Sequence, residues 1–310
     1  MEPTAPIGQD LQEGQQFEEY QVMTVRPSGY TEHEAVVRRK DGKIAAVRML
    51  NWDKLKIHYQ ARYFREAKEP PDPKALAERA LAKIRQRDAE FRACNERAVG
   101  ITHPALAAVH KIGTIPKTGQ TFVECDYVAG APLLQEATGM TWLQRLYFVP
   151  WLLEGLQVIH DRGFLHGNIK HRRIRATYQD GGPVAKWTDT GFCVPIHQWP
   201  ITLLGSAEYL PPEVILQKQD QIDQQSAGRD LKQLATMIEA ESAPLPPSTY
   251  VREIPKSLDD VIMALLEKDP AKRPFNSAGD LAAYFTEQWP EACQTLQTAD
   301  WTVSVETRAP

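Results

Sequence analysis

The side chains that could do chemistry in this chain lie mainly between residues 166 and 189. Asp189 carries a carboxylate that can ligate a divalent metal ion, and the guanidinium of Arg48 can bind a phosphate group. Two other side chains argue against a working catalytic site. Asn168 is a neutral amide that cannot take up a proton at neutral pH, and Arg173 repels a metal cation instead of ligating it. The residue types therefore suit the binding of a metal-bound phosphate better than proton transfer.

The segments that must position these residues alternate between extended and helical patterns. Residues 53–100 are rich in alanine, arginine and glutamate, and the prolines at 70–73 interrupt them, so we expect a long helix that starts at Asp72 or Pro73 and ends near Val99. A second long helix is expected over 141–163, and most of the chain after Trp142 is predicted to be helical. Strands are predicted at 20–25, 34–38, 44–50, 107–112 and 120–127, with a turn at 40–43.

Eight short motifs follow one another along the chain. They are H-P-A-L at 103–106, D-Y-V-A-G at 126–130, I-H-D-R-G at 159–163, H-G-N-I-K at 166–170, D-T-G-F at 189–192, G-S-A-E-Y-L-P-P-E at 205–213, R-D-L at 229–231 and K-D-P-A-K-R-P at 268–274. In their order and near-normal spacing the chain resembles the protein kinase superfamily over residues 17–289, and the nearest resemblance is to bacterial serine/threonine kinases.

The resemblance implies an α+β, bilobal protein kinase-like fold, with a small β-rich N-lobe that contains one major helix, αC, and a larger, mainly helical C-lobe. We expect a tail at 1–16, an N-lobe at 17–126 with a helical insertion around 53–87, a C-lobe at 127–289 and a second tail at 290–310.

The phosphate-binding parts implied by the resemblance are altered. Arg48 replaces the lysine that grips the nucleotide phosphates, and arginine is not an equivalent exchange at a tight site. Its glutamate partner on αC stays open among Glu66, Glu90 and Glu96, all of which equally suit a solvated helix surface. The glycine-rich loop keeps only Gly29.

Two acidic residues, Glu32 and Glu34, follow Gly29 and either face the phosphates with like charge or form a polar turn. The resemblance also gives a nucleotide-binding hinge that contains Asp126 and Val128, with Cys125 at the gatekeeper position.

The catalytic loop keeps His166 and Lys170 but carries Asn168 in place of the catalytic aspartate. Arg173 stands where a kinase has the second metal-binding asparagine. The resemblance implies that Asp189 is a retained magnesium ligand; alternatively, its side chain forms a hydrogen bond within its own turn. Because a general base alone contributes about 10²–10⁴ in rate, ordinary kinase turnover is not expected.

Residues that maintain the kinase fold are retained. Glu213 and Arg273 match a buried ion pair that ties the activation segment to the lower helices, and Asp230 matches the aspartate that anchors the catalytic loop. Gly167 replaces the arginine that, in the resembled family, binds a phosphate group on the activation loop. Regulation by phosphorylation of that loop is therefore not expected.

Composition fits this interpretation. The net charge of −4 over 310 residues offers no basic field for nucleic acid or a membrane surface. The four cysteines show no metal-binding spacing, and no segment resembles a signal peptide or a membrane span, so a cytoplasmic location is expected.

We therefore predict a pseudokinase that acts as a scaffold or allosteric regulator by binding protein partners, with weak or no binding of ATP and magnesium. The alternatives are an atypical ATP-dependent transferase or weakly active serine/threonine kinase, and an ATP sensor without catalysis.

Overall fold

The computed structural model of the chain describes residues 11–27, 32–179, 182–191, 193–196, 211, 230–232, 234–235 and 245–292. Two compact units make up the chain. Within the described part of the chain, the first contains residues 11–100 and 109–127, and the second contains residues 101–108 and 128–292. The expected boundary between the lobes lies after residue 126, whereas residues 101–108 group with the second unit.

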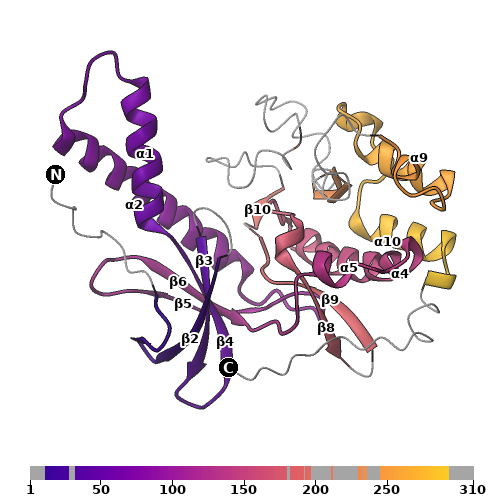
Figure 1. Ribbon diagram of the computed structural model, residues 1–310, viewed down its shortest axis with the longest axis horizontal. Coiled ribbons are helices and arrows are strands. Elements are labelled where there is room, and N and C mark those ends of the chain that lie inside the picture. The colour runs from indigo at the N-terminus through magenta and orange to yellow at the C-terminus, as the bar shows by residue number, and fades with distance from the viewer. Residues whose placement is uncertain are drawn as a thin grey trace. The chain divides into compact units, whose positions relative to one another are not determined.

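A six-stranded antiparallel sheet forms the first unit, in the order β1-β2-β3-β4-β6-β5 (Figure 1). The predicted strands and the turn at 40–43 are confirmed. In that turn Gly42 adopts a φ of +81° and donates its N–H to Arg39 O, a conformation that glycine permits without strain. The strands are β1 (Gln16–Phe17), β2 (Tyr20–Pro27), β3 (Glu32–Arg39), β4 (Ile44–Leu50), β5 (Val109–Thr114) and β6 (Thr121–Asp126).

Residues 11–16, which we expected to belong to the N-terminal tail, pack onto the sheet. Leu11 is only 5% exposed and joins a core cluster that includes Phe17, Tyr20 and Phe122. The backbone N–H of Gly14 also donates to Val22 O at 2.9 Å. A single leucine among polar residues carried too little pattern to reveal this packing.

Two helices, α1 (Trp52–Glu66) and α2 (Pro73–Ala98), follow β4 and lie side by side (Figure 1). The predicted start of the second helix is confirmed: Asp72 is the N-cap, its side chain accepts from Ala75 N at 2.9 Å, and Pro73 is the first helical residue. The buried face of α2 contains Ala80, Ile84, Asp88, Phe91, Cys94, Asn95 and Ala98. Two polar residues therefore lie within an otherwise apolar face.

In the second unit the predicted helix over 141–163 is two helices, α4 (Trp142–Leu146) and α5 (Phe148–Asp161). Pro150 explains the break: it has no N–H to donate to Leu146 O, four residues earlier, so a continuous helix would lose that bond. The other elements described here are α3 (Leu133–Glu136), β7 (Phe164–Leu165), η1 (His171–Arg173), β8 (Ile174–Gln179), β9 (Gly182–Trp187), β10 (Val194–Pro195), η3 (Pro247–Thr249), α9 (Lys256–Leu265), η4 (Pro270–Lys272) and α10 (Ala278–Gln288).

Trp187 links three segments of the second unit. Its backbone donates to Ala105 O at 2.8 Å and accepts from Ala107 N at 2.9 Å, and its indole Nε1 donates to Leu152 O at 3.1 Å. These bonds place the strip 101–108 beside β9, which explains why that strip groups with the second unit.

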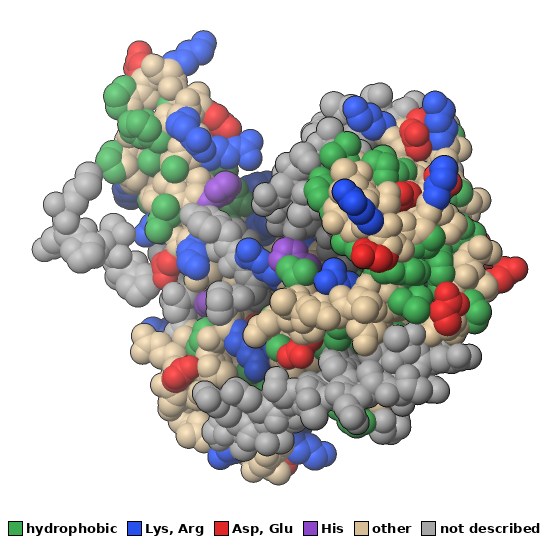
Figure 2. Space-filling model, turned by 45° about the vertical axis from the view of Figure 1, so that its right-hand side comes forward, with side chains coloured by type: hydrophobic (Ala, Val, Ile, Leu, Met, Phe, Trp, Pro, Cys, Tyr) green, Lys and Arg blue, Asp and Glu red, His purple; other side chains and the backbone are tan. Residues whose placement is uncertain are grey.

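The charged side chains are mixed in sign over the face in view in Figure 2. None of the helices in the described part of the chain is both long and apolar enough to cross a membrane.

Candidate active site

Asp230 anchors the loop that contains the altered catalytic positions. Its carboxylate accepts from the backbone N–H groups of His166 at 2.7 Å and Gly167 at 2.9 Å, and it lies 3.0 Å from His160 Nε2. Burial works to raise the pKa of Asp230, but the His160 hydrogen bond and charge, His166 and the Gly167 N–H together lower it below its ordinary value. The loop-anchoring role expected for Asp230 is thus matched by its contacts.

The second buried carboxylate, Asp189, is paired with Arg173. Arg173 Nη1 lies 2.9 Å from Asp189 Oδ2, and the two side chains are 2% and 1% exposed. The backbone supports this pair, because Thr188 N donates to Arg173 O at 2.8 Å. The Arg173 guanidinium therefore neutralises the carboxylate of Asp189, the residue expected from the sequence to be a magnesium ligand.

The opposite oxygen of Asp189 faces the catalytic loop and its own turn. Asp189 Oδ1 accepts from Gly191 N at 3.0 Å and lies 3.3 Å from His166 Nε2. His166 Nδ1 accepts from Asn168 N at 3.2 Å, which assigns the ring proton of neutral His166 to Nε2, toward Asp189. The sequence left two roles open for Asp189, a magnesium ligand or a hydrogen-bond partner within its own turn. Its contact with Gly191 N is the second of these.

Gly191 allows the turn after Asp189 to lie close against the catalytic loop at His166. It has a φ of +68°, and a Cβ on it would lie 2.0 Å from His166 O. Only glycine fits this backbone position without moving the catalytic loop.

A magnesium ion does not fit this cluster as it stands. Mg²⁺ needs oxygen ligands in near-octahedral order, but the Arg173 guanidinium lies against one Asp189 oxygen and places a positive charge beside the carboxylate that would hold the ion. Among the described residues no group of three or more His, Cys, Asp or Glu side chains is placed to hold a metal ion. The predicted role of Asp189 as a magnesium ligand is therefore not supported by its surroundings.

Asn168 and Lys170 differ in exposure. Asn168 is 4% exposed, whereas Lys170 is half-buried, and the 3₁₀ turn η1 follows with Arg173 N donating to Lys170 O at 2.9 Å. A buried neutral amide at the base position can donate or accept a hydrogen bond but cannot remove a proton from a hydroxyl.

In the first unit the partner of Arg48 is Asn95 on α2. Arg48 Nη2 donates to Asn95 Oδ1 at 2.9 Å, and both residues are buried, at 2% and 1% exposed. Asn95 Nδ2 in turn donates to Phe91 O at 2.8 Å, which fixes the amide orientation.

None of the three candidate glutamates makes the contact described for Arg48 and Asn95. Glu66 and Glu96 pair with arginines one helical turn away, Arg62 at 2.7 Å and Arg92 at 2.9 Å. Glu90 accepts from Gln86 Nε2 at 3.0 Å. Glu66 and Glu96 are exposed, as the solvated-helix interpretation expects, whereas Glu90 is half-buried.

Two buried polar side chains of α2, Asn95 and Asp88, were not singled out from the sequence. Asp88 accepts from Trp52 Nε1 at 3.0 Å, and from the N–H and hydroxyl of Thr121 at 3.0 and 2.6 Å. Burial raises the pKa of Asp88, against the effect of these hydrogen bonds. The available signal was spacing, because Asp88, Phe91 and Asn95 fall three and four residues apart on one helix face.

Glu34 is not an exposed turn residue, as one reading had it. It lies in β3, is 7% exposed and faces Arg26 across the β2–β3 pair, with 3.8 Å between Arg26 Nη1 and Glu34 Oε1. Arg26 Nη2 also donates to Tyr127 OH at 3.1 Å. Gly29 lies outside the described residues, so its predicted phosphate contact has no structural test.

The expected hinge residues end the first unit and begin the second. Cys125 is fully buried, with its thiol 3.7 Å from Ala46 O, and Val128 is 6% exposed. Asp126 Oδ1 lies 2.6 Å from His110 Nε2, so its carboxylate already has a partner on β5.

The predicted buried ion pair of the C-lobe can be followed on one side only. Arg273 is 3% exposed and its Nε donates to Glu267 O at 3.0 Å, while Glu213 lies outside the described residues.

Relatives of this chain are serine/threonine-protein kinases, although no protein-family model matches it. It is 28% identical over 246 residues to serine/threonine-protein kinase PknJ of Mycobacterium tuberculosis, and the match covers 70% of this chain and 41% of PknJ. It is 25% identical over 230 residues to a probable serine/threonine-protein kinase of Streptomyces coelicolor, covering 65% of this chain and 33% of that protein. The chain thus spans less than half the length of these relatives.

Solved structures agree on the fold. The kinase domain of Mycobacterium tuberculosis PknI, in a mutant form, superposes with a TM-score of 0.58 at 21% identity, covering 90% of this chain and 99% of that one. The apo form of PpkA-294 superposes with a TM-score of 0.64 at 15% identity, covering 89% and 99%. With a bilobal α+β kinase-like fold and serine/threonine kinases as its sequence relatives, the chain belongs to the protein kinase superfamily.

Proposed function

We propose that this chain is a pseudokinase, a catalytically impaired kinase domain that acts as a scaffold or allosteric regulator by binding other proteins. The Arg173–Asp189 ion pair is the observation that carries the proposal. Protein kinases hold their metal ions with the aspartate and the asparagine at these two positions, and the metals neutralise charge on the transferred phosphoryl group. A buried guanidinium paired with the aspartate removes both ligands at once.

The loss is compounded at the base position. Phosphoryl transfer depends on positioning and electrostatic stabilisation, and general-base assistance adds about 10²–10⁴ in rate. Asn168 supplies no base, and Arg48 is hydrogen-bonded to the neutral amide of Asn95. The proposal also includes weak or absent nucleotide binding. The hydrogen bond from Arg48 to Asn95 and the pairing of Asp189 with Arg173 would both lower the affinity for the nucleotide phosphates.

Retention of the fold supports a binding role. The Asp230 contacts, the Gly191 backbone and the Arg173–Asp189 pair connect the catalytic loop to neighbouring segments through groups of the chain itself. A domain whose loops are held by its own side chains can present a constant surface to a partner. We propose that it does so in the cytoplasm, in keeping with its sequence.

A phosphotransfer assay tests the catalytic part. Purified protein is incubated with labelled ATP and magnesium or manganese, alone and with a generic protein substrate, beside the Asp189→Ala variant. We expect both proteins to stay at background. Kinase-like labelling by the wild type that disappears in Asp189→Ala would refute the proposal.

The binding part is tested in cells that lack the gene. Restoration by a Lys170→Ala variant as complete as by the wild type is expected, because in an active kinase that lysine serves the γ-phosphate. A variant that is stable and expressed at the wild-type level but fails to restore function would indicate that phosphate chemistry is needed, as in the transferase or sensor alternatives.

A further inference from the structure

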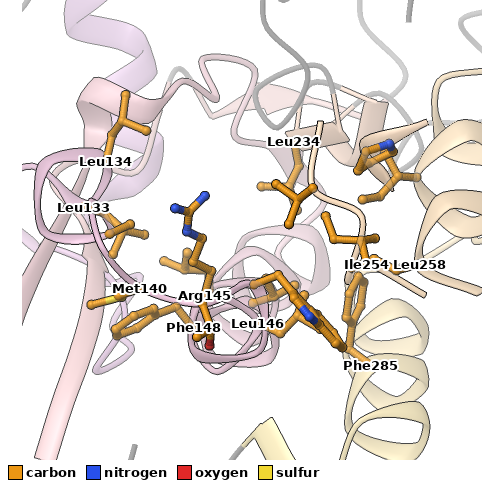
Figure 3. A pocket seen from close by; sticks show the side chains of 18 of the residues that line it. Leu133, Leu134, Met140, Arg145, Leu146, Phe148, Leu234, Ile254, Leu258 and Phe285 are labelled. Atoms are coloured by element: carbon orange, nitrogen blue, oxygen red, sulfur yellow. The ribbon is translucent and has the colours of Figure 1, made fainter. Parts of the chain in front are cut away.

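A cavity of about 560 Å³ lies within the second unit, and the end of the catalytic loop, at His171 and Ile174, forms part of its wall. The helices α3 and α4, the start of α5, and the segment from η3 to α9 line it (Figure 3). Its volume falls inside the range of about 300–1,000 Å³ that small-molecule sites occupy. Most of the lining is apolar and includes Leu133, Met140, Leu146, Phe148, Ile254 and Leu258.

The rim of this cavity is also apolar and open to solvent. Leu134 is 60% exposed and Val251 is 38% exposed, and both line the cavity. Apolar side chains exposed singly are common, but several gathered at the mouth of an apolar cavity are typical of a binding site.

One guanidinium stands at this cavity. In Figure 3, Arg145 extends from α4 between Leu133 and Leu134 on one side and Leu234 on the other. Arg145 is exposed, and within the described residues its side chain has no hydrogen-bond or ion-pair partner. The helix that carries it is fixed by a capping box, in which Thr141 Oγ1 accepts from Gln144 N at 3.2 Å and Thr141 N donates to Gln144 Oε1 at 2.8 Å.

We propose that this cavity binds a single-chain amphiphile with a carboxylate head, a fatty acid, with the chain among the apolar side chains and the carboxylate on Arg145. A guanidinium presents paired N–H groups that match the two oxygens of a carboxylate. Burial of methylene groups in the cavity supplies most of the affinity. Arg145 selects the head group.

Glu253 is the competing charge, because it also lines the cavity. An amphiphile with a cationic head would use Glu253 and be repelled by Arg145. The two side chains therefore make opposite predictions about the preferred head group, and both are exposed, so either can be changed without disturbing the core.

Isothermal titration calorimetry of the full chain with laurate, dodecanol and dodecylamine, below their micellar concentrations, tests the proposal. We expect laurate to bind more tightly than dodecylamine, and acetate, which has no chain, not to bind. Arg145→Gln should weaken laurate binding about three- to tenfold and leave dodecanol unchanged. Glu253→Gln should leave laurate binding unchanged or slightly tighter.

A third variant checks the location of the site. Leu134→Asp puts a negative charge on the exposed rim and should weaken laurate more than dodecanol. No binding of laurate, equal binding of laurate and dodecylamine, or an unaltered laurate affinity in both Arg145→Gln and Leu134→Asp would overturn the proposal.

Discussion

Replacing Arg173 by asparagine should turn the internal ion pair into a metal-dependent site. In the wild type, Arg173 and Asp189 are nearly inaccessible to solvent and lie 2.9 Å apart. Removing one member of such a pair leaves a buried charge uncompensated, which costs about 3–5 kcal/mol of unfolding free energy. For a domain of this size that corresponds to a melting temperature lower by about 6–20 °C.

The asparagine restores the pair of oxygen ligands with which kinases hold magnesium. We expect Mg²⁺ or Mn²⁺ to recover part of the lost stability of Arg173→Asn, because a ligand that binds only the folded state stabilises it. At a metal concentration ten times the dissociation constant the recovery is about 1.4 kcal/mol. The wild type should show no comparable response.

Thermal unfolding in EDTA and in increasing magnesium or manganese measures both effects. Arg172 is exposed on the same 3₁₀ turn, so Arg172→Asn is the matched control and should unfold like the wild type with or without metal. Adding Asp189→Asn to Arg173→Asn should abolish the metal response. An Arg173→Asn protein as stable as the wild type in EDTA, or a wild type that gains equal stability from magnesium, would refute the reasoning.

Three further predictions concern the buried polar contacts. Asp230→Asn should lower the free energy of unfolding by about 3 kcal/mol at neutral pH, as measured in urea. The pKa of Asp230 is lowered in the folded protein, so its stabilisation is present above the unfolded pKa and is lost as pH falls through the folded pKa. The difference between variant and wild type should therefore shrink below about pH 4. Asp88→Asn should cost about 1–3 kcal/mol in urea unfolding, since the amide cannot accept from both Trp52 and Thr121. A double-mutant cycle with Arg48→Met and Asn95→Leu should give a coupling of about 1–3 kcal/mol, whereas additive losses would contradict their hydrogen bond.

The sequence allowed the fold to be predicted because its periodic patterns are local. The strands of the first unit and the start of α2 at Asp72 and Pro73 follow from alternation and capping within short windows. The division into α4 and α5 was also readable, since Pro150 is visible, but a long amphipathic pattern on both sides of it masked the break.

The contacts of the site could not be predicted, because they join residues that are distant in the sequence. Arg173 and Asp189 were both singled out, yet their pairing depends on how η1 approaches the turn after β9. The partner of Arg48 was sought among glutamates because an acidic partner was expected. The structure instead places Asn95 on the buried face of α2 beside Arg48, where its amide oxygen accepts from the guanidinium.

The permanence of the guanidinium connects the altered residues to one another. A magnesium ion arrives with its nucleotide and leaves with it, so the conformation around Asp189 in a working kinase depends on ligand. Arg173 is covalently part of the chain, and its charge does not titrate near neutral pH. The turn at Asp189 and Gly191 is therefore held whether or not a nucleotide is bound. Under the proposed function, we therefore expect that a catalytic base restored at Asn168, or an acidic partner supplied to Arg48, would not by itself restore phosphoryl transfer, because Arg173 would still be paired with Asp189.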